Sequence, residues 1–180
     1  QSSFNAVSIM TGTGYVSANY SAWGGFASTI LLMVMFIGGC GGSTTCGIKV
    51  FRLQVLAATA RVQINRLLRP HAVVLAYYNR RPVTQEVMDS VMGFFYLYIL
   101  GFVLIATLLG LMGLDFVTAL SGAATSISNV GPGLGEVIGA EGNFSSLPDS
   151  AKWVMSFGML LGRLEIFTVL VMLNPAFWQR

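Results

Sequence analysis

Long apolar stretches without charge alternate with one basic and one acidic region along this chain. Residues 1–48 contain no charged residue, and Ser90–Leu114 adds 25 more without one. About 20 apolar residues are enough to cross a bilayer, so Ser90–Leu114 predicts a transmembrane helix. A further span is predicted over Ser150–Leu173, with Asn174-Pro175 as its stop signal. This pattern predicts an all-α integral membrane protein.

Two shorter apolar segments, Ser3–Thr11 and Phe116–Ile127, predict short helices, and Asp115 is placed to cap the second. Each is followed by a turn rich in hydroxyl groups and glycine. The turns read Thr11-Gly12-Thr13-Gly14-Tyr15 and Ser128-Asn129-Val130-Gly131-Pro132-Gly133.

The two turns belong to an internal repeat. Aligning Gly14 with Gly131 brings Thr11 and Ser128 into register. Further on, Met35-Phe36-Ile37-Gly38 matches Met159-Leu160-Leu161-Gly162. Both copies therefore read short helix, glycine turn, outer loop and long apolar helix. Repeats of this kind are common in transport proteins and bracket the permeation site.

Glycine gives the turns a specific chemistry, because it adopts positive φ without a steric clash and lets carbonyl groups turn toward a common axis. A ring of such carbonyls can replace the water shell of a potassium ion. A glycine-rich extracellular turn is the simpler alternative, but it gives no reason for the duplication. The candidate ion-binding residues are Thr11, Gly12, Thr13, Gly14, Ser128, Asn129, Val130 and Gly131.

The span that begins at Ala22–Ile37 meets five glycines within Gly38–Gly47. Each glycine costs a helix about 1 kcal/mol relative to alanine, so we expect a broken helix and a loop at membrane depth. Close packing through the Gly38/Gly42 pair is the alternative. Arg163 aligns with Gly39. A charged residue inside a predicted span indicates a functional position. The alternative is a structural ion pair between Arg163 and Glu165. The candidate gate residues are Gly38, Gly39, Gly41, Gly42, Gly47 and Arg163.

Composition supports a membrane setting, since 54% of residues are hydrophobic and only 9% are charged. Basic residues gather in 49–86 and acidic residues in 115–150, which predicts a cytoplasmic 49–86 segment by the positive-inside rule. The basic cluster lacks a nucleic-acid-binding motif. Within it, Ile48–Leu68 has the amphipathic pattern of a helix on the membrane surface, and Val73–Tyr78 predicts a strand or turn.

Smaller features carry expectations of their own. Thr84 is a candidate helix cap, and Tyr20 and Trp23 are candidate anchors at the membrane interface. Cys40 and Cys46 have no neighbouring metal ligands in the sequence, so we expect them to be small buried residues.

Together these motifs resemble the Trk/Ktr/HKT superfamily of potassium transporters, and most closely its TrkH-type bacterial members. The resemblance rests on Thr11–Tyr15, Gly38–Thr44, Asn129–Gly133 and Gly162–Glu165, which extend across nearly the whole chain. It implies four helix–pore-loop–helix repeats around one pore. This chain would supply the end of the third repeat (1–50), a cytoplasmic linker (51–86) and the fourth repeat (87–180). No transmembrane helix precedes the first turn, so we expect the C-terminal part of a longer protein.

The resemblance also implies the setting of the protein. It predicts a multi-pass protein of the bacterial cytoplasmic (inner) membrane that transports K⁺ and has no covalent cofactor. Membrane lipid, a second copy in a homodimer and a cytoplasmic nucleotide-binding regulatory ring are the partners it predicts; nucleic acid is not among them. The resemblance further implies that the two turns supply the filter carbonyls, that Gly38–Gly47 is a gating loop, and that Arg163 faces the pore.

Two other classes of function compete. A non-conducting membrane subunit or scaffold could pack its helices through small residues, but it has no reason to duplicate a hydroxyl–glycine turn after a short helix. An enzyme could use Gly131, Gly133 and Gly135 as a phosphate cradle, but no predicted strand precedes these glycines, as a dinucleotide fingerprint requires. We therefore predict a transport protein and no enzyme.

Overall fold

The computed structural model describes residues 1–41, 43, 45–69, 75–164 and 171. These residues are mainly helical. The helices are α1 (Ser2–Thr11), η1 (Tyr20–Trp23), α2 (Gly25–Phe36), α3 (Val50–Leu68), α4 (Gln85–Leu111), α5 (Phe116–Ser128), η2 (Phe144–Ser146) and α6 (Asp149–Arg163). A short antiparallel hairpin of β1 (Tyr77–Tyr78) and β2 (Arg81–Pro82) joins α3 to α4.

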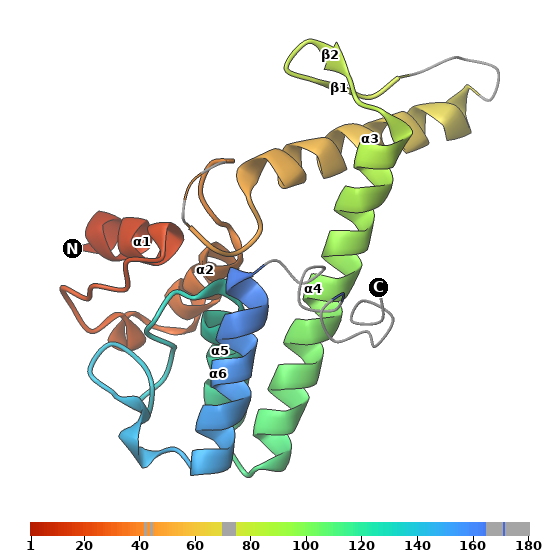
Figure 1. Ribbon diagram of the computed structural model, residues 1–180. Coiled ribbons are helices and arrows are strands. Elements are labelled where there is room, and N and C mark those ends of the chain that lie inside the picture. The colour runs from red at the N-terminus through yellow and green to blue at the C-terminus, as the bar shows by residue number, and fades with distance from the viewer. Residues whose placement is uncertain (42, 44, 70–74, 165–170, 172–180) are drawn as a thin grey trace.

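The long helix α4 is the axis of the structure (Figure 1). Helices α5 and α6 pack beside its C-terminal half, while α3 crosses its N-terminal end next to the hairpin. The main core forms where α4, α5 and α6 meet. Alanines of α5 and α6 let the helices approach closely there, and larger side chains of α4 fill the remaining space. Its buried residues include Phe94, Ile105, Leu109, Ala119, Ala123, Ala151 and Met155.

A second core joins the two halves of the chain. Ile9 of α1 and Met35 of α2 pack in one cluster with Ala124 of α5 and with Val130 and Leu134, which follow α5. Because this cluster takes residues from both predicted repeats, it holds the turn after α1 near the turn after α5.

Most predicted elements are confirmed with shifted ends. The predicted helices Ser3–Thr11 and Ile48–Leu68 appear as α1 and α3. Helix α4 begins at Gln85, directly after the predicted cap residue Thr84, and ends three residues before Leu114. It is the one helix among the described residues long and apolar enough to cross a membrane, so the multi-pass arrangement stays a prediction.

The predicted caps fare differently. Asp115 caps α5 as predicted, since its carboxylate accepts a hydrogen bond from the Thr118 N–H at 3.1 Å. Thr84 holds the cap position of α4, but its side chain makes no capping hydrogen bond, so that part of the prediction is wrong.

One further prediction is corrected. The uninterrupted span Ser150–Leu173 is wrong, because α6 ends at Arg163 and Leu164 leaves helical geometry at φ −89° and ψ 7°. Hydropathy records only the length of an apolar run and does not report such a break. Glu165 and the predicted stop signal lie outside the described residues. Within the predicted strand or turn Val73–Tyr78, Tyr77–Tyr78 forms the first strand of the hairpin.

Candidate functional site

The turn after α1 begins as soon as the helix ends. Gly12 caps the helix in the left-handed region (φ 69°, ψ 20°), and Gly14 returns to positive φ at 72°. The Gly12 N–H donates to the Ile9 carbonyl at 3.2 Å, and the Thr13 N–H donates to the Ser8 carbonyl at 3.1 Å. The backbone thus alternates between two conformations over Gly12–Gly14.

The turn after α5 repeats this geometry. Asn129 caps α5 at φ 53°, and Gly131 returns to positive φ at 111°. The Asn129 N–H donates to the Ser126 carbonyl at 3.2 Å, and the Val130 N–H donates to the Thr125 carbonyl at 3.1 Å. Each donor and acceptor lies 117 residues after its counterpart in the first turn. The sequence register of Gly14 with Gly131 therefore coincides with a shared backbone conformation.

The two turns lie against each other, with no room for a side chain at Gly14. A Cβ atom on Gly14 would lie 2.6 Å from the Val130 carbonyl oxygen. A Cβ atom on Gly131 would lie 3.7 Å from Cα of Gly14. Only glycine at position 14 permits this approach, because the contact is with backbone that cannot rotate away.

Side chains anchor the second turn more firmly than the first. The Asn129 side-chain amide donates to the Met159 carbonyl of α6 at 3.0 Å. The Ser128 hydroxyl is 2.7 Å from the Tyr98 hydroxyl of α4, in a buried contact. In the first turn, the Thr11 hydroxyl bonds back to the Val7 carbonyl of its own helix at 2.7 Å.

The predicted glycine loop begins where α2 ends, at Phe36. Backbone hydrogen bonds close it at its base: Gly38 N–H donates to the Ile48 carbonyl at 2.9 Å, and Ile48 N–H donates to the Phe36 carbonyl at 2.8 Å. The Val50 N–H, at the start of α3, donates to the Gly39 carbonyl at 3.2 Å. Helix α2 ends at Phe36, where the glycine run was predicted to interrupt it, and the alternative of a helical packing face fails because Gly38 is not helical. A loop at membrane depth stays a prediction. Gly42 lies outside the described residues.

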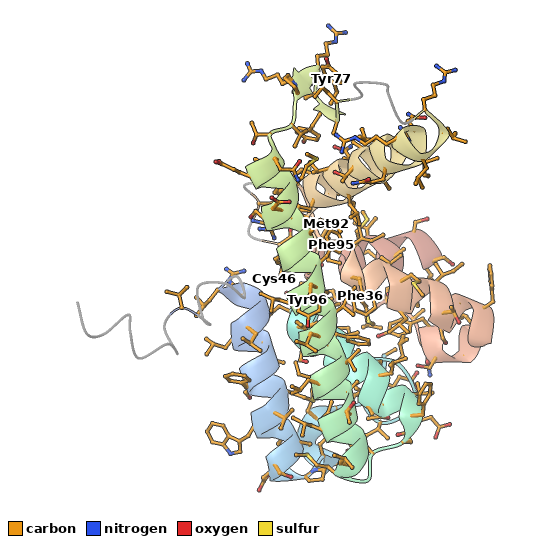
Figure 2. All side chains as sticks on the ribbon, turned by 90° about the vertical axis from the view of Figure 1, so that its right-hand side faces the viewer. Phe36, Cys46, Tyr77, Met92, Phe95 and Tyr96 are labelled. Atoms are coloured by element: carbon orange, nitrogen blue, oxygen red, sulfur yellow. The ribbon has the colours of Figure 1, made fainter. Side chains whose placement is uncertain are left out.

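Arg163 and the loop meet, although 117 residues separate the contacting side chains. The Arg163 guanidinium is 3.6 Å from Cys46 Sγ. Both line a cavity of about 150 Å³, which is also bordered by Lys49, Arg52 and Tyr98. Figure 2 shows Cys46 at the end of α6, beside α4.

Other loop residues are less enclosed than expected. Cys40 is exposed and Cys46 half-buried, so the expectation of two buried cysteines is wrong. The reason is that the loop extends from the base that its backbone hydrogen bonds close, and Cys40 lies outside the packed core. Gly41, a further candidate gate residue, is exposed and lies near the ring of Phe51.

Tyr20 has a role that the sequence did not reveal. It was predicted to anchor the membrane interface, but it is fully buried and its hydroxyl donates to the Gly133 carbonyl at 2.9 Å. Ser21 beside it donates to the Gly135 carbonyl at 3.0 Å. Because the partners lie more than a hundred residues away, no local pattern marks these residues. Tyr20 and Ser21 tie the outer loop of the first repeat to the second turn.

The backbone hydrogen bonds that follow α5 argue against the hypothesis that this glycine-rich segment binds a phosphate. A cradle offers several N–H groups to an anion, yet here these groups already have partners. Gly131 N–H donates to the Thr125 hydroxyl, Gly133 N–H to the Ile138 carbonyl, and Leu134 N–H to the Ser121 hydroxyl.

Comparison with known proteins decides the family. The model of the TrkH family, described as cation transport protein, matches residues 1–180. The chain belongs to the TrkH family. This is a family of membrane transport proteins and not of enzymes, as the sequence predicted.

Curated TrkH-family relatives match the chain along its length. It is 50% identical over 180 residues to the Trk system potassium uptake protein TrkI of Halomonas elongata, covering all of this chain and 37% of that protein. It is 42% identical to TrkH of Vibrio parahaemolyticus, covering 99% of this chain and 36% of that one. The crystal structure of the potassium transporter TrkH from Vibrio parahaemolyticus superposes with a TM-score of 0.88 at 41% identity, covering 97% of this chain and 37% of that one. The chain thus spans little more than a third of the length of these relatives.

Proposed function

We propose that the chain forms part of a potassium-conducting pore, in which the turns Thr11–Gly14 and Ser128–Gly131 each contribute one strand of the selectivity filter. The observation that carries the proposal is the matched pair of positive-φ turns that lie against each other after two short helices. The names of the relatives, which are potassium uptake proteins, support the same ion. A non-conducting scaffold finds no support among them.

The filter works through backbone carbonyls. Alternation of φ between successive residues turns carbonyl groups toward one axis, where they substitute for the hydration shell of K⁺. Helices α1 and α5 end at the turns, so the partial negative charge of their C-termini favours a cation there. The hydrogen bonds that the N–H groups of the turns donate to Ser8 and Thr125 hold this backbone in place.

The gate in this proposal is the loop Gly38–Gly47 together with Arg163. The support is their contact through Cys46 and the closure of the loop base by backbone hydrogen bonds. A guanidinium beside the ion path repels a cation by about 4 kcal/mol at 4 Å and an effective dielectric constant near 20. Movement of α3, which begins at the base of the loop, would displace the barrier.

The wider setting is part of the proposal. We infer a multi-pass protein of the bacterial inner membrane whose segments 1–50, 51–86 and 87–180 are the end of one pore repeat, a cytoplasmic linker and a complete pore repeat. The relatives are named as members of a Trk system, which supports associated components. A homodimer and a cytoplasmic nucleotide-binding ring are the components that the family resemblance predicts.

The filter is tested with Gly131→Ala in the full-length protein. An added Cβ at position 131 has space, with nothing nearer than 3.7 Å, but positive φ is strained for alanine. We expect the carbonyls to shift and the preference for potassium over sodium uptake to fall at least tenfold. Gly113→Ala is the matched control, since Gly113 also has positive φ and open space but lies in the loop before α5. Equal selectivity in both variants would refute the filter assignment.

The gate is tested with Arg163→Ala in the full-length protein in proteoliposomes. Removing the charge should raise potassium flux several-fold at unchanged selectivity. Lys152→Ala removes a cation from the other end of α6, where Lys152 pairs with Asp149 on the surface, and should leave flux unchanged. If the Arg163→Ala protein is folded and its potassium flux stays the same or falls, Arg163 is not part of the barrier.

A further inference from the structure

Helix α3 has one packed face and one open apolar face. Val55 and Val62 are buried on the side where α3 contacts α4 and β1. In the second half of the helix Ile64, Leu67 and Leu68 are exposed, the last two by 83% and 74%. At 100° per residue these three side chains form one stripe on the side opposite Val62. A large exposed apolar stripe of this kind marks an interaction surface.

Basic residues accompany the stripe. Arg61 borders it next to Leu68, while Arg66 and Arg69 lie around the helix on the side opposite the stripe, near Val62. All three arginines are exposed. Helix α3 contains no acidic residue, and the neighbouring hairpin adds Arg80 and Arg81. An apolar stripe with arginines on the polar side is the pattern of a helix that lies in a membrane interface. Its charge selects an anionic surface.

The position of α3 fits a membrane surface. It crosses the end of α4 where the apolar helix gives way to Gln85, Glu86 and Asp89, and its second half extends beyond α4 (Figure 1). In Figure 2 Tyr77 marks the hairpin beyond this end, and Met92, Phe95 and Tyr96 mark the apolar part of α4 on the other side of α3. The level of α3 is therefore that of lipid headgroups, given a membrane-spanning α4.

We propose that the second half of α3 is a binding surface for anionic phospholipid. Ile64, Leu67 and Leu68 insert among the acyl chains, and Arg61, Arg66 and Arg69 bind the lipid phosphates. Arginine suits this role because its planar guanidinium binds phosphate through two hydrogen bonds. This proposal rests on the membrane setting of the proposed function, but it requires neither the filter nor the gate.

The test measures the depth of α3 directly. A nitroxide label is attached at Leu68→Cys in the full-length protein, in a background without its native cysteines. The control label is at Asn65→Cys, which is exposed and lies about 110° around the helix from the centre of the stripe. The protein is reconstituted in phosphatidylcholine vesicles with or without 30% phosphatidylglycerol. Collisions with oxygen report burial in lipid, and collisions with a water-soluble nickel chelate report exposure.

With phosphatidylglycerol the label at position 68 should favour oxygen and the label at position 65 the chelate. Each arginine near an anionic leaflet contributes roughly fivefold to the equilibrium constant for docking. Arg61→Gln, Arg66→Gln and Arg69→Gln together should therefore lower that constant about 100-fold. Arg80→Gln with Arg81→Gln, which removes two charges from the hairpin, is the control and should lower the docking constant less than any two of the α3 substitutions. Chelate access at position 68 in both vesicle types would overturn the proposal. So would an immobile label that does not respond to lipid composition, because a protein partner or second copy would then cover the stripe.

Discussion

The two short helices that precede the turns differ in their surroundings but not in their ends. Helix α5 is enclosed by α4 and α6 and is buried from Thr118 onward except at Leu120. Helix α1 exposes Phe4, Val7 and Met10, and within the described part of the chain no counterpart of α4 packs against it. Nevertheless the same capping hydrogen bonds and positive φ values follow both helices. The turn geometry is therefore set by the local sequence and not by enclosure.

The longer helices of the two halves also correspond, but they end differently. Helix α2 stops at Phe36 and gives way to the glycine loop, whereas α6 continues to Arg163. The aligned glycines, Gly38 and Gly162, both lack room for a side chain. A Cβ at Gly38 would collide with the Cys46 carbonyl, and one at Gly162 with the Ile127 carbonyl. One position thus serves loop closure in the first half and helix packing in the second.

The largest effect should come from breaking this packing. Gly162→Ala forces α6 away from the backbone of α5 and should cost about 3 kcal/mol of folding free energy. Thermal unfolding of the full-length protein in detergent would measure it. Gly110→Ala is the control, because nothing lies within 4 Å of a Cβ there and alanine favours the helix. A Gly162→Ala protein as stable as Gly110→Ala would show that α6 does not press against α5.

Substitution at Asn129 tests the difference between the two turns. Asn129→Ala loses the hydrogen bond to the Met159 carbonyl and strains the left-handed backbone, which together should cost about 2.5 kcal/mol. Asn129→Gly installs the residue found at Gly12 and should cost only about 1 kcal/mol, because glycine carries no strain. The same unfolding assay would measure both. If Asn129→Ala and Asn129→Gly lose the same folding free energy, alanine is not strained by the left-handed backbone at position 129.

Tyr20→Phe removes one hydrogen bond between the two halves of the chain, the one from the Tyr20 hydroxyl to the Gly133 carbonyl. Leaving the buried Gly133 carbonyl without its donor should cost about 1.5 kcal/mol. Burial raises the pKa of Tyr20 to about 12, above about 10 in the unfolded chain. The stabilisation should therefore be complete below pH 10 and decline between pH 10 and 12, where only the unfolded state loses the proton. Unfolding measured against pH should show the two proteins converging over that range, and a constant difference would contradict the assignment.

The smallest effect concerns the cap of α5, which α1 lacks. Asp115→Ala should cost about 1 kcal/mol. Hydrogen bonds from Thr118 hold the pKa of Asp115 below its ordinary 3.8, so the stabilisation is present above about pH 4 and is lost as pH falls through the folded-state pKa. Asp115→Asn should retain a cap without that pH dependence. If the stability of Asp115→Ala falls with decreasing pH as steeply as that of wild type, the Asp115 carboxylate does not cap α5 as described.

Local signals account for what the sequence could predict. Asp115 directly before an apolar run and Gly12 directly after one mark helix ends, and five glycines within Gly38–Gly47 mark the end of α2. The register of Gly14 with Gly131 was accessible for the same reason, because a repeated turn needs the same residue types at the same spacing.

Contacts between distant segments were not accessible. Tyr20 looks like any interfacial aromatic residue until Gly133 lies beside it, and nothing near Ser128 in the sequence indicates Tyr98. The end of α6 was missed because Leu164 continues the apolar pattern while its backbone leaves the helix. The contact of Arg163 with the loop was anticipated only through the repeat, which aligned it with Gly39, and Cys46 as its partner was not.

The central claim is that the two turns together bind the transported ion. Anomalous diffraction from crystals of the full-length protein soaked in rubidium, a potassium substitute, tests it most directly. We expect an anomalous peak within coordination distance of backbone oxygens from both Thr11–Gly14 and Ser128–Gly131. Peaks confined to other sites, with the turns in the conformation described above and no ion beside them, would contradict it.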